Sequence, residues 1–481
     1  MTSKQRSRPW LPCYPGTRML KAALAVSVFS FSLFAAAQPN RLQGSFRQPE
    51  KNGWIFVHLQ GAPSQLGFQH GYLLAPEIED LLRVEKVALA HDSGKDWAFF
   101  RKAAETIYLP RIEPQYREEL EGIVDGLHAH GAGGDLIDIV ILNAWPELSP
   151  YYTNWYDKQK ALISFVPRPV PEHCSAFVAT GSYTRDGRPV IAHNNWTDYS
   201  VGSRWNIIFD IAPSSGHRIL MDGEPGVIDS GDDFGENDAG MVITETTIGH
   251  FVGFDPNGIP EFVRARKAMQ YATNIDEFAA IMKEGNNGAY ANTWLLADMR
   301  SNEIGSLELG LKHVTLERSK DGYFVGSNFP ADPALIRDET DFHAADKTVS
   351  ENARHARWLQ LMGENKGRID LATAQRFLGD HYDTVDNVNA PSERTICGHI
   401  DLSPRGSSPW QPAYGPAGAV QNKATDAAMA LRMSLTAAMG HACGLDFHAS
   451  QHIGEHPEFE WQKDILRDLN AYPWTTFSIA Q

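Results

Sequence analysis

Apart from one segment near its start, the sequence lacks any apolar run long enough to cross a membrane. It also lacks internal repeats and low-complexity segments, which excludes repeat architectures and long disordered tracts. Positive charge is scarce: 43 Lys and Arg stand against 59 Asp and Glu, a net charge of −16. Such acidity disfavours binding to nucleic acid or an anionic membrane through the general field. With 42% hydrophobic and 21% charged residues, the composition is that of an ordinary soluble globular protein.

The apolar run near the start is typical of a targeting segment. Residues 22–34 carry no charge, follow several basic residues and precede three alanines at positions 35–37. This pattern predicts a secretory signal peptide over residues 1–37, with an uncleaved anchor as the alternative. No cysteine follows the run at the cleavage point, which argues against a lipoprotein anchor. The protein is therefore expected to be secreted or periplasmic, without a stable membrane span.

Three cysteines follow the predicted signal peptide: Cys174, Cys397 and Cys443. An odd number in an exported protein suggests one disulfide and one thiol outside it. The most economical pairing joins Cys397 to Cys443 and leaves Cys174 as the thiol. The sequence leaves open whether Cys397 and Cys443 also remain reduced.

A β-hairpin is predicted directly after Cys174. One apolar run follows this cysteine, another ends just before His193, and the polar stretch between them contains an Asp-Gly pair, a strong turn signal. Such a hairpin would bring Cys174 close to His193, Asn195 and Asp198. A thiol beside an imidazole, an amide and a carboxylate is a candidate nucleophile. A buried structural cysteine beside polar strand ends would show the same spacing.

Helical patterns dominate the sequence before Cys174, and short strand-like segments dominate after it. Short strands at this spacing indicate antiparallel sheets. Amphipathic helices are predicted over residues 262–272 and 275–284, and a helix rich in Ala and Met over residues 425–439.

Several segments resemble a known family in the same order along the chain. His-Cys-Ser-Ala-Phe at 173–177 and His-Asn-Asn-Trp-Thr-Asp-Tyr at 193–199 resemble the nucleophile region of the phospholipase B-like proteins. Three further segments resemble later blocks of that family: residues 225–234, 244–248 and 287–294. Others are similar to the related acyltransferases and hydrolases of peptidase family C45: residues 118–126, 142–147, 380–381 and 396–399. Both groups are N-terminal-nucleophile (Ntn) hydrolases.

The resemblance implies an α+β fold, the four-layer αββα sandwich with two stacked antiparallel sheets. It also implies self-cleavage between His173 and Cys174, so that the freed α-amino group, with a pKa near ~7.7–8.0, can serve as general base to the thiol. The products would be a mainly helical fragment, 38–173, and a catalytic fragment, 174–481, which stay associated in one compact domain. The family often has Gly or Ser where this chain has His173.

By the same resemblance, five more residues receive candidate roles. Asn292 would donate to the oxyanion, although the family often has a second Asn where this chain has Ala291. His193 would orient the amine or bind substrate, and Asp198 or Asn195 would hold the amine. Glu245 would bond within the site or cap a strand.

The predicted function is hydrolysis of a linear amide or ester in a small acylated substrate or lipid, without a cofactor. Acyl transfer of the C45 type is an alternative, and so is a non-catalytic binding protein on the same fold. A third alternative is a zinc hydrolase built on a C-terminal cluster of residues: His441, Cys443, His448, His452 and His456. Their spacing matches no known zinc finger, and Cys443 has a use in the disulfide, so no metal is expected.

Overall fold

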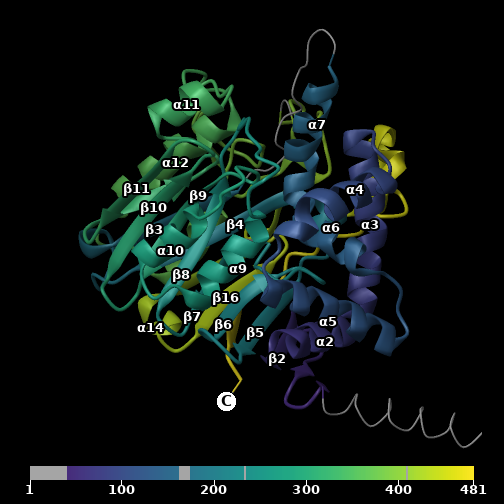
Figure 1. Cartoon of the computed structure of the whole chain (residues 1–481). Coiled ribbons are helices and arrows are strands. Elements are labelled where there is room, and N and C mark those ends of the chain that lie inside the picture. Colours follow the sequence, from purple (N-terminus) through teal and green to yellow (C-terminus); the bar gives the residue numbers. More distant parts are fainter. Residues whose placement is uncertain (1–40, 162–173, 232–233, 408–409, 481) are drawn as a thin grey trace, which may run out of the picture. The chain divides into compact units, whose positions relative to one another are not determined.

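The structure is a computed structural model that describes residues 41–161, 174–231, 234–407 and 410–480. The predicted signal peptide, residues 1–37, and His173 with the proline-rich stretch before it lie outside the described residues. The chain divides into two units, Met1–Gln43 and Gly44–Gln481, and the second contains every element described below (Figure 1). In the part of the chain that the structure describes, no helix is both long and apolar enough to cross a membrane.

The larger of two central sheets has nine strands, in the spatial order β1-β2-β5-β6-β7-β8-β9-β10-β11. Its neighbouring strands are antiparallel except for the parallel pair β2 and β5. The strands are β1 (Phe46–Arg47), β2 (Ile55–Gly61), β5 (Ile207–Pro213), β6 (Ile219–Gly223), β7 (Phe234–Asn237), β8 (Met241–Thr247), β9 (Asn292–Asp298), β10 (Glu303–Leu309) and β11 (Val314–Ser319).

The second sheet has six strands, in the order β12-β3-β4-β15-β16-β17, and its pairs are all antiparallel. Its strands are β12 (Gly322–Gly326), β3 (Ser175–Thr180), β4 (Val190–Asp198), β15 (Ala417–Asp426), β16 (Ser434–Met439) and β17 (Thr475–Ser478). A separate two-stranded sheet pairs β13 (Tyr382–Asp383) with β14 (Val388–Asn389).

Helices cover the outer faces of both sheets. Those that share a core with the nine-stranded sheet are α2 (Pro63–Leu73), α3 (Ala75–Ser93), α4 (Trp97–Ala103), α5 (Pro114–His130), α6 (Leu136–Glu147), α9 (Glu261–Tyr271) and α10 (Ile275–Lys283). Two pack on the six-stranded sheet: α12 (Ser350–Glu364) and α13 (Leu371–Leu378). The remaining helices are α7 (Thr153–Lys160), α8 (Tyr199–Gly202), α11 (Pro333–Glu339), α14 (Ala427–Ala430) and α15 (Ala449–Glu455).

Short helical turns of the 3-10 or π type complete the secondary structure: η1 (Ala104–Tyr108), η2 (Leu109–Arg111), η3 (Leu148–Tyr152), η4 (Gly181–Tyr183), η5 (Ile400–Leu402) and η6 (Pro457–Gln462).

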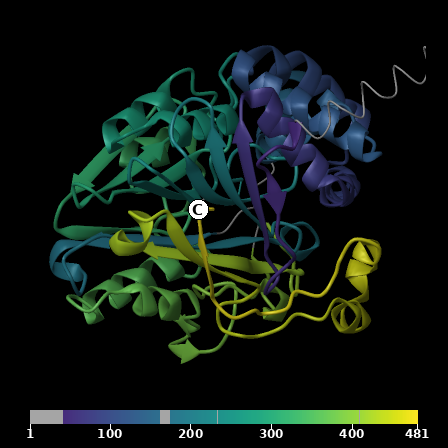
Figure 2. The same cartoon turned by 90° about the horizontal axis from the view of Figure 1, so that it is seen from below.

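The core has three apolar layers, which define a four-layer αββα sandwich (Figure 2). Between the sheets, Val178 and Ile191 of the six-stranded sheet lie in one cluster with Ile208 and Val242 of the nine-stranded sheet. The other two layers join each sheet to its helices. The predicted α+β fold with two stacked antiparallel sheets is therefore confirmed, with β2 and β5 as the one parallel pair among the described strands of these sheets.

Helix α2 lies unusually close to helix α5 because glycines replace side chains at the contact. A Cβ added at Gly67 would lie 1.8 Å from the carbonyl oxygen of Glu119, and one at Gly71 would lie 2.0 Å from that of Ile123. Both glycines lie within α2, and their lack of a side chain permits the close packing of the two backbones.

The prediction of a helix over residues 425–439 is wrong. This segment contains the end of β15, the short helix α14 and the strand β16. Ala and Met favour helices intrinsically, but β15 pairs on both sides, with β4 and with β16, and is buried in the six-stranded sheet. Tertiary burial has overridden local propensity here.

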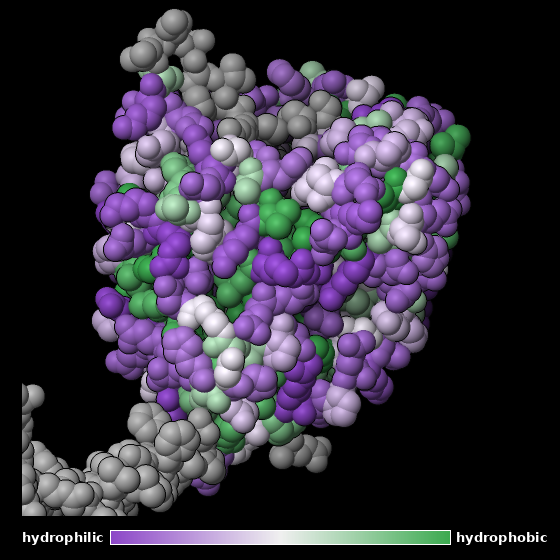
Figure 3. Space-filling model, turned by 90° about the vertical axis from the view of Figure 1, so that its right-hand side faces the viewer, coloured by the Kyte–Doolittle hydropathy of each residue, from purple (hydrophilic) through white to green (hydrophobic). Residues whose placement is uncertain are grey.

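One face of the molecule is shown in space-filling form in Figure 3. On this face hydrophilic side chains predominate, and hydrophobic ones appear in small areas separated by them. The face therefore shows no continuous apolar surface of the kind that marks a large partner contact.

Candidate functional site

Cys174 lies directly before β3, an inner strand of the six-stranded sheet, and is 2% exposed. The predicted hairpin is confirmed: β3 pairs with β4 so that Ser175 is opposite Asn194 and Ala176 is opposite His193. Gly187 in the connecting turn has φ 77°, a left-handed conformation that favours glycine.

Two residues that the sequence did not single out hold the backbone of Cys174. Its N–H donates to Asn328 Oδ1 at 2.9 Å, and its carbonyl oxygen accepts a hydrogen bond from Arg354 Nη1. Asn328 follows β12 with φ 63° and donates through Nδ2 to the carbonyl oxygen of Thr247 at 2.8 Å. Nothing in the sequence marks Asn328 or Arg354; only the pairing of β12 with β3 and the packing of α12 bring them to Cys174.

The guanidinium of Arg354 also contacts three other side chains near Cys174. It donates to Asn328 Oδ1 and to Ser175 Oγ, each at 3.0 Å, and its guanidinium lies 4.5 Å from the ring centre of Trp196. Burial lowers the pKa of Arg354 to about 10, opposed by the attraction of nearby groups that include Cys174. The group remains protonated at neutral pH, and a positive charge close to a thiol favours the thiolate.

His193 and Asn195 lie on the face of β4 that looks toward the other sheet, because alternate residues of a strand share a face. His193 is opposite Ala176 on one side and Lys423 on the other. Both of its ring nitrogens are buried without a hydrogen-bond partner among the described residues. Burial and then the Lys423 charge hold the pKa of His193 well below its usual value, so the ring is neutral at pH 7.

A fully buried ion pair joins the two sheets on this inner face. Lys423 Nζ of β15 lies 2.5 Å from Asp222 Oδ2 of β6. Asp222 also accepts from Ser230 Oγ at 2.7 Å. A buried pair of this kind depends on each partner to neutralise the other. No local pattern in the sequence marks this pair, because the two residues lie far apart in the chain.

Asp198 stands at the end of β4. Its Oδ1 accepts from Gln411 Nε2 at 2.6 Å. Burial, and then the charge of Asp92, hold the pKa of Asp198 well above its usual value. The backbone N–H of Cys174 donates to Asn328, and the role of Asp198 or Asn195 in holding the α-amino group after cleavage stays a prediction.

Glu245 and Asn292 lie on neighbouring strands of the nine-stranded sheet. Glu245 Oε1 accepts from Tyr290 Oη at 3.1 Å. Asn292 is fully buried, and both atoms of its amide lack a hydrogen-bond partner among the described residues. It is opposite Thr247, whose carbonyl oxygen accepts from Asn328. A buried amide with unmade hydrogen bonds is costly, which suits a group that awaits a ligand.

An aromatic groove borders this end of the strands. It has a volume of about 200 Å³, and its lining includes Tyr151, Trp155, Phe251 and Phe254. Tyr151 and Phe251 belong to one apolar cluster with Ala291, the residue before Asn292.

The disulfide predicted between Cys397 and Cys443 is absent: both are free cysteines in the part of the chain that the structure describes. The two sulfurs lie near the same atom, His399 Nε2, at 3.6 Å and 3.5 Å respectively. The histidines considered for a zinc hydrolase do not form one cluster with Cys443: His441 contacts Leu445 O at 2.7 Å, and the exposed His448 lies 3.6 Å from Asp468.

Two stacked sheets between helical layers, with a cysteine directly before an inner strand, match the αββα architecture that the sequence resemblance implies. The family model for phospholipase B matches residues 118–315. An uncharacterised protein of Archaeoglobus fulgidus is 24% identical over 403 residues, which cover 73% of this chain and 62% of that protein. Putative phospholipase B-like 2 of Mus musculus is 24% identical, with coverages of 58% and 53%. The resemblance to the phospholipase B-like proteins is confirmed.

Solved structures with similarity include a mutant of the conjugated bile acid hydrolase from Clostridium perfringens. It is 10% identical, covers 55% of this chain and 89% of its own, and has a TM-score of 0.33. Penicillin V acylase from Agrobacterium tumefaciens is 12% identical with coverages of 55% and 83% and a TM-score of 0.31. The chain spans only about half to three fifths of the length of the curated relatives it matches, 62%, 53% and 56% for three of them.

Proposed function

We propose that this protein is an exported, self-processed cysteine hydrolase that cleaves a linear amide or ester bond of an acylated substrate. The observation that carries the proposal is the position of Cys174, at the start of an inner strand, with its N–H held by Asn328 and its carbonyl by Arg354. These two side chains fix the backbone of Cys174 at the point where cleavage would create a new N-terminus.

Activation would begin with attack of Cys174 Sγ on the carbonyl carbon of His173. The peptide C–N bond breaks as the S–C bond forms, which gives a thioester and transfers a proton to the nitrogen of Cys174. Water then hydrolyses the thioester to the His173 carboxylate and restores the thiol. The new α-amino group would occupy the place of the present N–H, within hydrogen-bond reach of Asn328 Oδ1.

In each turnover the α-amino group would accept the thiol proton. The thiolate attacks the substrate carbonyl, and the tetrahedral intermediate expels the amine or alcohol, which takes that proton. Water hydrolyses the resulting thioester and releases the acid. Arg354 supports the thiolate through its charge, and Asn292, whose amide is unpartnered among the described residues, is the proposed donor to the oxyanion.

The remaining predicted residues take supporting roles in this proposal. His193 is a neutral hydrogen-bonding group on the inner face, next to the Lys423 and Asp222 pair. Asn195 lies on the same face of β4. Asp198 and Glu245 shape the surroundings through Gln411 and Tyr290.

The aromatic groove suggests which substrates fit. An apolar acyl chain would lie against aromatic side chains such as Tyr151 and Phe251, with its carbonyl directed toward Cys174 and Asn292. Lysophospholipids and N-acyl amino acids both present such a chain, and the similarity to putative phospholipase B-like proteins favours the lipids.

The fragments on either side of the cleavage point are expected to stay associated. Strand β2, together with helices α2 to α6, precedes Cys174 and shares one apolar core with strands and helices that follow it. Separation would expose that core to water.

The test is the intact mass of the purified protein under reducing, denaturing conditions. Two fragments that meet at His173 and Cys174 are expected for the wild type, and one uncut chain for Cys174→Ala. An uncut wild-type chain, or equal cutting in Cys174→Ala, would remove the N-terminal amine and with it the mechanism. Release of fatty acid from lysophospholipids and acyl amides, with and without an added amine acceptor, then separates hydrolysis from acyl transfer.

A further inference from the structure

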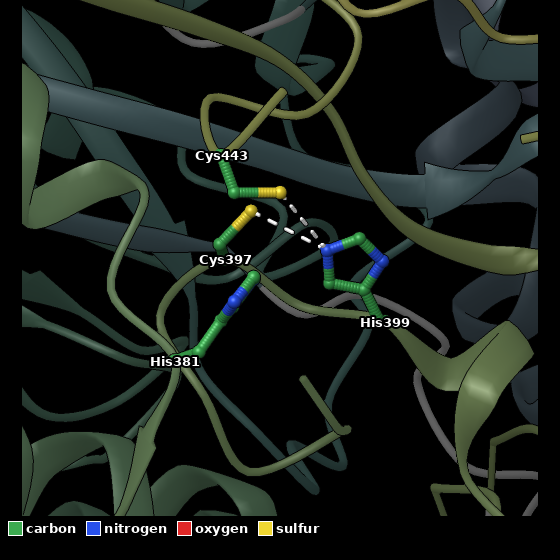
Figure 4. A group of neighbouring side chains, drawn as sticks. All are labelled: His381, Cys397, His399 and Cys443. Carbon is green, nitrogen blue, oxygen red and sulfur yellow. Dashed lines mark hydrogen bonds between the residues drawn. The ribbon is translucent and has the colours of Figure 1, made fainter. Parts of the chain in front are cut away.

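Four metal-binding side chains from three segments of the chain point toward one another (Figure 4). His381 precedes β13, Cys397 and His399 precede η5, and Cys443 follows β16. One ligand atom from each lies within 4.8 Å of the ligand atoms of the other three. We propose that these four residues bind a structural zinc ion. The proposal is independent of the proposed hydrolase activity.

The separations suit tetrahedral zinc. With Zn–S near ~2.3 Å and Zn–N near ~2.0–2.1 Å, tetrahedral geometry separates a sulfur ligand from a nitrogen ligand by roughly 3.5–3.6 Å. His399 Nε2 lies 3.6 Å from Cys397 Sγ and 3.5 Å from Cys443 Sγ. Two thiolates and two imidazoles form a donor set that selects zinc over magnesium or calcium.

The backbone holds these side chains in place before any ion binds. The N–H of Cys397 donates to the carbonyl oxygen of Asp380 at 3.1 Å, which ties its loop to the residue before His381. His381 Nε2 is buried and has no hydrogen-bond partner among the described residues. A buried ring nitrogen left without a partner is costly, and a metal would satisfy it.

His399 has the second partner that zinc-binding histidines usually have. Its other ring nitrogen, Nδ1, lies 3.7 Å from Asp401 Oδ1, which in turn accepts from Tyr199 Oη at 2.8 Å. A carboxylate behind the ring fixes its orientation and raises its basicity as a ligand.

A second group, His399 with Asp401 and His441, is also close enough to share an ion. It is the weaker candidate because its donor atoms have other partners. His441 Nδ1 contacts Leu445 O at 2.7 Å, and His441 Nε2 lies 3.0 Å from Tyr199 Oη. The group that contains both cysteines supplies four ligands and so closes the coordination sphere, as structural zinc sites do.

The zinc site would support the side chains of Trp196 and Arg354, which pack next to Cys174. A Cβ added at Gly398, between two of the ligands, would lie 2.1 Å from Trp196 Cζ2, so this loop packs directly on the indole. Another contact of that indole is the guanidinium of Arg354, which binds the carbonyl oxygen of Cys174. Loss of the ion would loosen the loop under Trp196 and lower the thermal stability of the protein.

The experiment measures metal in the full chain, expressed with zinc in the medium and purified without oxygen or chelator. Elemental analysis should find one zinc per chain. Replacement by Co²⁺ should give the intense visible absorption of a tetrahedral thiolate site. Zinc removal by a chelator should lower Tm, and added Zn²⁺ should restore it.

Variants locate the ion. His381→Ala and Cys443→Ser should lose the zinc, and Asp401→Asn should weaken its binding by roughly 10–100-fold. His448→Ala, a nearby exposed histidine outside the group, is the matched control and should keep it. The proposal is overturned by protein without zinc, by a Cys397–Cys443 disulfide in peptide maps, by stoichiometric iron or copper instead, or by zinc retained in both His381→Ala and Cys443→Ser. If a variant does not fold, the Co²⁺ spectrum of the wild type decides alone.

Discussion

Asn328→Gly should slow both self-cleavage and turnover without disturbing the backbone. The change removes the acceptor for the N–H of Cys174 and the donor to the carbonyl oxygen of Thr247. Asn328 has φ 63°, which glycine adopts without strain, whereas alanine would add about 1–2 kcal/mol. The glycine variant therefore isolates the hydrogen bonds from the conformation.

The size of the effect follows from the groups left unpaired. Each buried donor or acceptor without a partner costs about 1–3 kcal/mol, and some of this will be regained by relaxation. If about 1.4–2.7 kcal/mol of the loss falls on the transition state, the rates fall by about 10–100-fold. The assays are the rate constant for appearance of the two fragments, followed by mass, and kcat/KM for an acyl substrate.

Asn52→Gly is the matched control. Asn52 also has a positive φ, 51°, and donates one side-chain hydrogen bond, to Thr475 Oγ1 at 2.8 Å. Its partner is on β17, at the opposite edge of the six-stranded sheet from β12. Equal cleavage rates and kcat/KM in the two glycine variants would refute the role of Asn328.

A negative charge at position 328 should shift the pH dependence of kcat/KM in a direction that can be predicted. In Asn328→Asp the acceptor remains, but a carboxylate faces the α-amino group after cleavage. A negative neighbour stabilises the protonated amine and raises its pKa, so less free base is present at neutral pH. The acidic limb of the kcat/KM profile should move to higher pH. A purely structural Asn328 would leave that limb where it is.

Three further predictions concern stability, each measured by urea unfolding. Gly67→Ala should lower the free energy of unfolding by more than the ~1–3 kcal/mol of ordinary overpacking, because backbone atoms occupy the place of the added Cβ. A Cβ added at Gly363 has nothing within 4 Å, so Gly363→Ala should raise the free energy of unfolding by about 0.5–1 kcal/mol. Burial chiefly lowers the pKa of His70 from 6.5 to about 3, so between these pH values the unfolded chain binds one proton more than the folded chain. The free energy of unfolding should therefore fall by up to about 1.4 kcal/mol per pH unit from pH 6.5 toward pH 3. His70→Gln should flatten this slope. Lys423→Met should cost about 3–5 kcal/mol by stranding Asp222, and adding Asp222→Asn should recover much of it.

Each of these stability predictions has a result that contradicts it. Gly67→Ala as stable as Gly363→Ala would mean that α2 and α5 do not pack through their glycines. An unchanged pH slope in His70→Gln would assign the slope to other groups. A double variant no more stable than Lys423→Met would show that the lysine acts through packing and not through its charge.

Local patterns in the sequence were enough to predict much of the fold. The helices predicted over residues 262–272 and 275–284 agree to within one residue at each end with α9 and α10. Their periodicity and flanking residues are local signals. Residues 425–439 were predicted wrongly because their Ala and Met content is a local signal too, while burial between two strands is not.

Of the candidate site residues, the sequence could group only those that lie next to the hairpin. Cys174, His193 and Asn195 are neighbours across one turn, so the sequence could group them. Asn328 and Arg354 reach Cys174 from 154 and 180 residues away in the chain. A single asparagine after a strand, or an arginine within a helix, carries no mark of such a contact.

Strand β4 explains how the proposed nucleophile site and the proposed zinc site depend on each other. Its alternate residues face opposite sides of the six-stranded sheet. His193 and Asn195 face the nine-stranded sheet, whereas Asn194 and Trp196 face outward, where the indole N–H donates to Asn194 Oδ1. The ring of Trp196 is then held between the guanidinium of Arg354 and the loop that carries two of the zinc ligands. Because Arg354 holds the carbonyl of Cys174, zinc loss should slow self-cleavage before it unfolds the chain. A cleavage rate in zinc-free, still folded protein equal to that of the zinc-bound form would show that the two sites are independent.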